Sequence, residues 1–226
     1  MAFKKRFAHF FWRIIAGVLL STLFCAFAIP APAFASDLPD SLPTLDAFMK
    51  RSIDGNANVL RGVYVPNVLA DSVVQQPTGL PGFVSTLDST TTQFRLAADA
   101  GNIGLLAHNF LAGSSFSKII QGDRIILVYG DGRTEIFLVE SILRFQALDP
   151  LSPYSLFKDL ETQNTLTAED LFNIAYRGQY HVTLQTCIEK EGELSWGRLF
   201  IIATPIVDEY IHIQYNQTVS ILRTPH

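Results

Sequence analysis

The chain has 226 residues, of which 17 are basic and 21 are acidic, so its formal net charge is −4 at pH 7. Hydrophobic residues make up 48% of the sequence, enough for one domain with a substantial core. An acidic chain without a basic stripe lacks the positive charge that neutralises phosphates, which argues against a nucleic-acid-binding protein.

Residues 1–35 have the pattern of a secretory signal peptide. A basic start precedes the apolar stretch 14–29, and small residues at Ala33 and Ala35 form a signal-peptidase site. The stretch has 16 residues, fewer than the roughly 20 that a spanning helix prefers. We expect export and cleavage after Ala35, with an uncleaved membrane anchor as the alternative. The cleaved chain keeps 13 basic and 21 acidic residues, a net charge of −8.

The rest of the chain divides into three parts by composition. Residues 36–60 mix prolines, acids and a short apolar patch, which predicts a stalk or loosely packed lead-in. Residues 61–207 alternate short apolar runs with Gly, Pro, Asp and Asn, as expected of one folded domain. Residues 208–226 extend beyond the last predicted core strand and could add an edge strand.

Short strands dominate the predicted elements. One or two strands are expected over 62–76, an extended segment over 90–94, a hairpin over 124–139 with its turn at 130–133, and strands over 180–187 and 199–207. Short helices are expected at 116–120, capped by Ser114 or Ser115, and after a capping box that begins at Thr167. The fold class is therefore all-β, a sandwich or a closed barrel.

Cys187 is the single cysteine that remains after removal of the signal, since Cys25 lies within it. Exported chains usually pair their cysteines in disulfides, so a lone thiol is unusual. It is either a buried, inert side chain or a nucleophile, and a nucleophile needs a base or a cation beside it.

Two residues could serve the thiol. His108 ends the apolar run 103–107, and Arg198 opens the run 199–203, facing Cys187 if residues 188–197 form a connecting loop. His181 is excluded, because six residues along one strand place it roughly 20 Å from Cys187. A single histidine or arginine at a strand end is more often an ordinary surface or core residue. Together with a lone thiol, His108 and Arg198 support the hypothesis of a Cys-His-Arg enzyme.

The run TLQTC at 183–187, followed by Arg198 before LFIIA, resembles the signature of the sortase family. Upstream, LLAHN at 105–109 and FSKIIQGDRIIL at 116–127 are similar to the sortase histidine segment, so the resemblance covers residues 60–206. It implies a closed β-barrel of about eight strands with short helices in the connections. It also implies an exported or membrane-anchored cysteine transpeptidase, located outside the cell or in the cell envelope.

The resemblance assigns roles residue by residue. Cys187 would attack a sorting motif in a substrate protein, His108 would exchange protons, and Arg198 would stabilise the oxyanion or position the substrate. Thr183 and Thr186 would line the substrate groove. An amine of a cell-wall precursor or a pilin lysine would accept the acyl group, and this chemistry requires no metal or organic cofactor.

Ala107 and Asn109 depart from the family pattern around the histidine. Segment 149–179, rich in aromatic residues, occupies the place of the substrate-selecting loop. Two alternatives stay open: a sortase-fold binding or structural protein whose triad is idle, and a thiol protease that releases its product to water.

Overall fold

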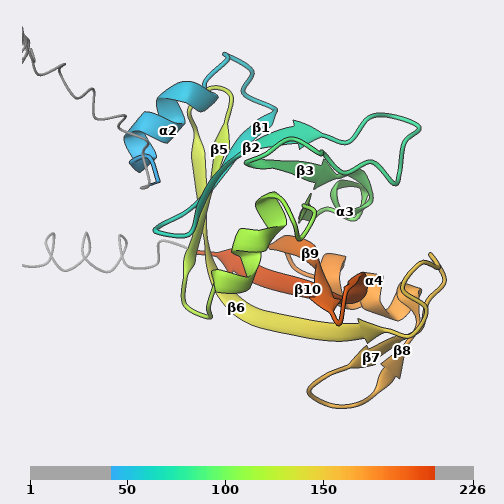
Figure 1. Ribbon diagram of the computed structural model, residues 1–226. Coiled ribbons are helices and arrows are strands. Elements are labelled where there is room, and N and C mark those ends of the chain that lie inside the picture. The colour runs from blue at the N-terminus through green and yellow to red at the C-terminus, as the bar shows by residue number, and fades with distance from the viewer. Residues whose placement is uncertain (1–41, 207–226) are drawn as a thin grey trace, which may run out of the picture. The chain divides into compact units, whose positions relative to one another are not determined.

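A computed structural model describes residues 42–206 (Figure 1). The predicted signal peptide at 1–35, the first part of the lead-in and the extension at 208–226 lie outside the described residues. Within residues 42–206, no helix combines the length and the apolarity that a membrane crossing requires.

Eight strands form a closed barrel in the order β10-β9-β4-β3-β2-β1-β5-β6, which the pairing of β6 with β10 completes. Their bounds are β1 Leu60–Val65, β2 Leu69–Gln75, β3 Thr90–Phe94, β4 Ile103–Leu106, β5 Arg124–Tyr129, β6 Thr134–Ala147, β9 Val182–Lys190 and β10 Glu193–Pro205. Closure confirms the prediction of a β-barrel of about eight strands, and it leaves the sheet no long free edge.

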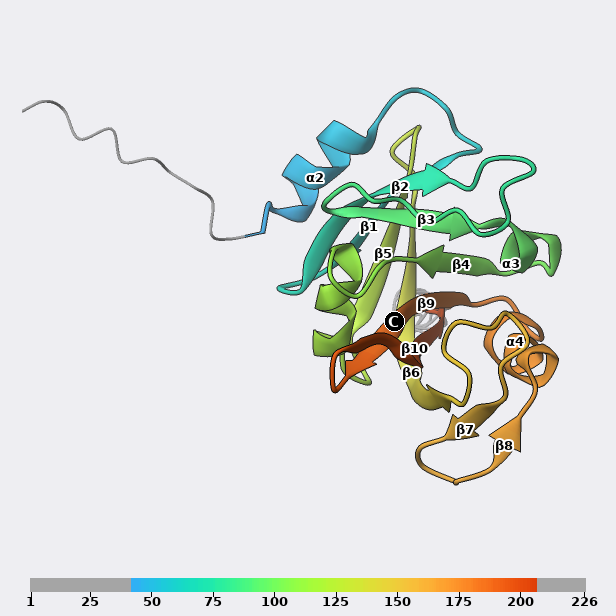
Figure 2. The same cartoon turned by 45° about the vertical axis from the view of Figure 1, so that its right-hand side comes forward.

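The remaining elements are short and lie in the connections. They are α2 Leu45–Ser52, α3 Arg95–Asp99, the 3₁₀-helix η1 Ala112–Lys118, the two strands β7 Phe157–Asp159 and β8 Thr165–Leu166, and α4 Ala168–Tyr176. The strands β7 and β8 form a hairpin that extends from the end of β6, and α4 lies beside it (Figures 1 and 2).

Successive side chains along each strand point alternately into the barrel and toward its outer face. On β10, Leu199, Ile201 and Ala203 belong to the interior core, whereas Phe200 belongs to a second cluster with residues of α4 and β7. Side chains of a strand point alternately to the two faces of a sheet, so both faces of β10 are apolar and covered. Complete burial of one such side chain stabilises the fold by about 1.5–3 kcal/mol.

The helix α4 begins where the sequence predicts. The Thr167 hydroxyl accepts a hydrogen bond from the backbone N–H of Asp170, whose carboxylate accepts one from the N–H of Thr167, which is the expected capping box. The helix buries Leu171, Ala175 and Tyr176 against the outer face of the barrel.

The lead-in differs from the loose segment expected from its composition. Helix α2, capped by Thr44, buries Phe48 against Tyr64, Ile126 and Val128 on the barrel. The apolar patch is too short to show helical periodicity in the sequence, but one buried aromatic ring anchors the helix.

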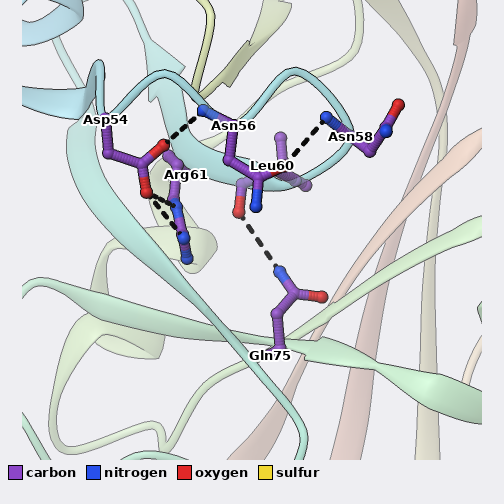
Figure 3. Close-up of polar contacts among 6 residues, drawn as sticks. All are labelled: Asp54, Asn56, Asn58, Leu60, Arg61 and Gln75. Carbon is purple, nitrogen blue, oxygen red and sulfur yellow. Dashed lines mark hydrogen bonds and ion pairs between the residues drawn. The ribbon is translucent and has the colours of Figure 1, made fainter.

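A polar network fixes the connection between α2 and β1 (Figure 3). Asp54 accepts hydrogen bonds from the backbone N–H of Asn56 at 3.0 Å and from Nε of Arg61 at 2.8 Å, and these contacts hold the pKa of its carboxyl below the usual range. Gln75 of β2 donates to the carbonyl of Leu60 at 3.2 Å (Figure 3). The start of β1 is thereby held to its neighbours.

Candidate active site

Cys187 lies on β9 directly opposite Arg198 on β10. Partner residues on antiparallel strands point to the same face of the sheet, so the two side chains are neighbours there. Cys187 is partly exposed and forms no disulfide within residues 42–206. The prediction that the two residues face each other across a strand pair is confirmed.

The predicted ten-residue loop between these strands is wrong. β9 continues to Lys190 and β10 begins at Glu193, and Glu191 and Gly192, both with positive φ, make a tight turn. The register shifts between Glu193 and Gly197, where β10 carries extra residues in a bulge. The arm mixes charged residues with Ile188, Leu194 and Trp196, so it lacks the regular alternation by which strands are recognised.

His108 reaches the same region through parallel pairing of β4 with β9, which places β4 between β3 and β9 (Figure 2). Leu106 is level with Gln185, and the N–H of Ala107 donates to the carbonyl of Gln185 at 3.1 Å. The strand pairing ends there, and His108 follows two residues after Leu106, in the segment that leaves β4. Cys187 and Arg198 thus lie on the adjacent strands β9 and β10, and His108 lies in the segment that follows β4, the other neighbour of β9.

The His108 ring is half-buried and stacks on Phe110, with 5.2 Å between the ring centroids. Among residues 42–206, no hydrogen bond joins this ring to the Cys187 thiol. Asn109, which the sequence marks as a departure from the family pattern, donates from its side chain to the carbonyl of Leu194 at 2.9 Å. This bond links the histidine segment to the β9–β10 arm.

The Arg198 guanidinium is held at the base of the hairpin arm. Its Nη1 donates to the carbonyls of Ser195 and Gly197, both at 2.9 Å, and its central carbon lies 5.9 Å from the ring centroid of Phe157. Its other N–H groups make no hydrogen bond within the described part of the chain. The bulge supplies one of these carbonyls, so the irregular register helps to orient the arginine.

Thr183 and Thr186 are both buried and donate their hydroxyls to backbone carbonyls. Thr183 is 0% exposed and donates to Ala175 of α4 at 2.6 Å, and Thr186 donates to Ala107 at 2.9 Å. Thr186 also lines a cavity beside Cys187. Contact between Thr183 and a substrate would require α4 to move, so the predicted groove-lining role of the two threonines stays a prediction.

Each member of the Cys187–Arg198 pair lines a cavity of its own. Cys187 lines one of about 340 Å³, here called the end cavity, together with residues of η1, β6 and the segment after β4. Arg198 lines one of about 280 Å³, here called the outer cavity, on the barrel face that α4 covers.

The sequence analysis does not identify two residues near the site, Gln185 and Gly113. Gln185 points to the same face as Cys187, lines the outer cavity and accepts a hydrogen bond from the Tyr176 hydroxyl at 2.5 Å, and burial raises the pKa of Tyr176. Strand alternation through 183, 185 and 187 could have identified it. Gly113 allows η1 to pack closely, since a Cβ there would lie 2.3 Å from the Thr186 hydroxyl and 2.7 Å from the His108 carbonyl.

The closed barrel of eight strands agrees with what the resemblance implies. The fold is sortase-like. No protein-family model matches the sequence, and no curated protein matches it. Within residues 42–206, no group of three or more His, Cys, Asp or Glu side chains is arranged to hold a metal ion.

Solved structures similar to this one include three sortases. Sortase A of Listeria monocytogenes is 15% identical with a TM-score of 0.41, covering 70% of this chain and 96% of its own. The sortase D5 transpeptidase of Clostridium perfringens is 14% identical at 0.41, covering 72% and 89%. A lid mutant of sortase A from Corynebacterium diphtheriae is 16% identical at 0.42, covering 76% and 83%. At these values the likeness assigns no role to any residue.

Proposed function

We propose that this protein is a cysteine transpeptidase that cleaves a sorting-type motif in a substrate protein and transfers the acyl group to an amine. The observation that carries this proposal is the strand register, which pairs Cys187 with Arg198, while the parallel pairing of β4 with β9 ends two residues before His108. A lone thiol, a titratable base and a fixed cation are the groups that acyl transfer needs.

In the proposed reaction, the Cys187 thiol gives its proton to His108, and the sulfur attacks the backbone carbonyl of the motif and forms a tetrahedral intermediate. N–H groups of Arg198 that make no hydrogen bond to residues 42–206 stabilise the negative oxygen. The C–N bond then breaks, His108 donates a proton to the departing amine, and a thioester remains on Cys187. An acceptor amine attacks this thioester, the C–S bond breaks, and the thiol is regenerated.

The partners follow from the same proposal. The acyl donor is a protein or peptide with a sorting motif, and the acceptor is an amine such as a cell-wall precursor or a pilin lysine. The protein acts outside the cell or in the envelope after export through residues 1–35, either cleaved or retained as an anchor.

One observation favours a second candidate. His108 stacks on Phe110 and makes no hydrogen bond to Cys187 within residues 42–206. A binding or structural protein with an idle triad would tolerate this arrangement, although hydrogen bonds between nucleophile and base are often loose before substrate binds.

Thiol labelling separates the two candidates. The mature chain 36–226 has one cysteine, so iodoacetamide uptake measured by mass reports Cys187 alone. An active enzyme labels readily in the folded state, and His108→Ala changes the pH profile of the labelling rate. Labelling only after denaturation, or identical profiles for both proteins, contradicts the enzyme.

A second measurement separates transfer from hydrolysis. The mature chain is incubated with a peptide library and hydroxylamine, and the products are identified by mass. Hydroxamates are expected because an amine captures the thioester, whereas free acids alone indicate a hydrolase.

A further inference from the structure

Two successive residue pairs of β9 and β10 connect the thiol with the outer cavity. Cys187 is paired with Arg198, and Gln185 is paired with Phe200, two positions further along both strands. Side chains two positions apart on a strand point to the same face, so all four lie on one face of the sheet. Arg198, Gln185 and Phe200 line the outer cavity. A molecule held between Cys187 and Arg198 that extends into this cavity therefore passes Gln185.

The outer cavity is mainly apolar. Five of its ten lining residues are aromatic, and no aspartate or glutamate is among them. Apart from the Tyr176 hydroxyl, its polar side chains are those of Gln185 and Arg198, and both carry N–H donors. The cavity thus suits an apolar group that has a hydrogen-bond acceptor beside it, and Arg198 disfavours a second cation there.

Tyr176 fixes the side-chain amide of Gln185. The Tyr176 hydroxyl donates a hydrogen bond to Oε1 of Gln185 at 2.5 Å. The tyrosine is 2% exposed, and its ring packs edge-on against Phe94 and Phe200, with 5.3 Å and 6.2 Å between the ring centroids. A ring held in this way gives the hydroxyl one position. The amide oxygen of Gln185 is therefore already in use, and its nitrogen, Nε2, is the group left to bind another molecule.

This nitrogen is unpaired and still accessible. It makes no hydrogen bond to any residue between 42 and 206. In the same part of the chain, Oδ2 of Asp71 is the one fully buried side-chain polar atom without a partner, so Nε2 of the half-buried Gln185 is not sealed in the core. An oriented donor at the edge of an apolar cavity gains from an acceptor that a ligand brings.

We infer that Gln185 binds the acyl donor, and that its Nε2 donates a hydrogen bond to a carbonyl oxygen about two residues away from the carbonyl that Cys187 attacks. The spacing follows from strand geometry, because Gln185 and Cys187 are two positions apart on β9 and an extended peptide has the same rise of about 3.3 Å per residue. Tyr176 is a positioning residue that acts through Gln185. The donor is a peptide with an apolar group next to this carbonyl. Gln185 takes no part in bond formation, and the inference rests on the proposed function.

A test that needs no known sorting motif compares two p-nitrophenyl esters on the mature chain 36–226. The ester of phenylacetyl-Gly-Gly has a carbonyl two residues from the reacting one, followed by an aromatic ring, whereas p-nitrophenyl acetate has neither. With both esters the Cys187 thiol gives its proton to His108, a C–S bond forms, and the C–O bond to p-nitrophenolate breaks. The rate of acyl-enzyme formation is followed by mass, and Cys187→Ala reports acylation elsewhere.

The readout is the ratio of the acylation rate constants for the long and the short ester. Gln185→Met keeps the length of the side chain and removes Nε2. We expect it to lower the ratio about tenfold, which corresponds to about 1.4 kcal/mol. Gln185→Glu keeps the acceptor for the Tyr176 hydroxyl and replaces the donor, so the same fall in the ratio is expected if Gln185→Met does not fold.

Two tyrosine variants test the positioning role. Tyr176→Phe is expected to lower the ratio in the wild-type background and to have no further effect on Gln185→Met, because it acts only through Gln185. A merely structural role would lower the ratio in both backgrounds. Tyr180→Phe is the matched control, since the Tyr180 hydroxyl donates to Glu135 at 2.6 Å and the residue does not line the outer cavity. It should leave the ratio unchanged.

The two esters also separate the possible failures. If neither ester acylates Cys187 in the folded protein, the proposed function fails and the inference fails with it. If Cys187 is acylated but the ratio is the same in wild type, Gln185→Met and Gln185→Glu, the inference alone is overturned.

Discussion

Asp71 lies on the face of β2 that points into the barrel, between Leu69 and Val73 of the interior core and opposite Val63 on β1. It is 5% exposed, and its Oδ2 atom has no hydrogen-bond partner within the described residues. Burial raises the pKa of this carboxyl to about 7, because the charged form is poorly solvated there. At neutral pH the core therefore contains a group close to ionisation.

The raised pKa predicts a stability that falls as pH increases. Since the folded protein holds the Asp71 proton up to about pH 7 while the unfolded chain releases it near pH 3.8, its contribution is complete below pH 3.8 and lost through pH 7. Asp71→Asn is expected to raise the free energy of unfolding at pH 8 by at most about 4 kcal/mol, the equivalent of the pKa shift.

Urea unfolding at pH 5, 6, 7 and 8 measures this effect. The gain from Asp71→Asn should shrink as the pH falls, and Asp88→Asn, at an exposed position, serves as the matched control. An equal gain at pH 5 and pH 8 would contradict the assignment to ionisation.

At the scale of elements, the 3₁₀-helix η1 positions the histidine segment. The N–H of Gly113 donates to the carbonyl of His108 at 3.0 Å, and the glycine lies against the Thr186 hydroxyl. This close approach is available to glycine alone, because a Cβ at 113 would overlap both groups.

Gly113→Ala is therefore expected to lower the free energy of unfolding by about 1–3 kcal/mol, the usual effect of overpacking. It should also displace the His108 segment and alter the pH profile of Cys187 labelling. Gly82→Ala is the control, because a Cβ at position 82 meets no atom within 4 Å. If Gly113→Ala and Gly82→Ala behave alike in unfolding and labelling, η1 does not position the site.

The elements that the sequence predicts correctly are those specified by residues close together in the chain. The hairpin over 124–139 follows from its Asp-Gly turn, and α4 follows from the capping box at Thr167. The bulge at Ser195 and the packed helix α2 have no local signature, because the first depends on the register with β9 and the second on a single ring, Phe48. Gln185 and Gly113 matter only through neighbours that lie far away in the sequence.

At the scale of the whole molecule, the candidate site depends on one long-range strand pair. β4 and β9 pair in parallel, and the hydrogen bond between Thr186 and Ala107 joins residues 79 positions apart. Contacts between residues so distant form slowly, because loop closure must precede them.

The labelling behaviour that depends on His108 is therefore expected to appear only in the last phase of refolding. The mature chain is diluted from urea and pulsed with iodoacetamide at successive times, while the fluorescence of Trp196 on the β9–β10 arm is followed in parallel. The difference between wild type and His108→Ala should emerge no earlier than the final fluorescence change. A difference in the earliest pulses would mean that thiol and histidine meet before the barrel closes.

The threonines of the TLQTC run have a consequence for how such a motif is interpreted. Their hydroxyls are used by the carbonyls of Ala175 and Ala107, so the two side chains hold α4 and the histidine segment in place. Two of the residues by which the motif is identified, Thr183 and Thr186, therefore have a structural role. A relative could keep both threonines and recognise a different peptide, because segment 149–179, which is predicted to select the substrate, lies outside the motif.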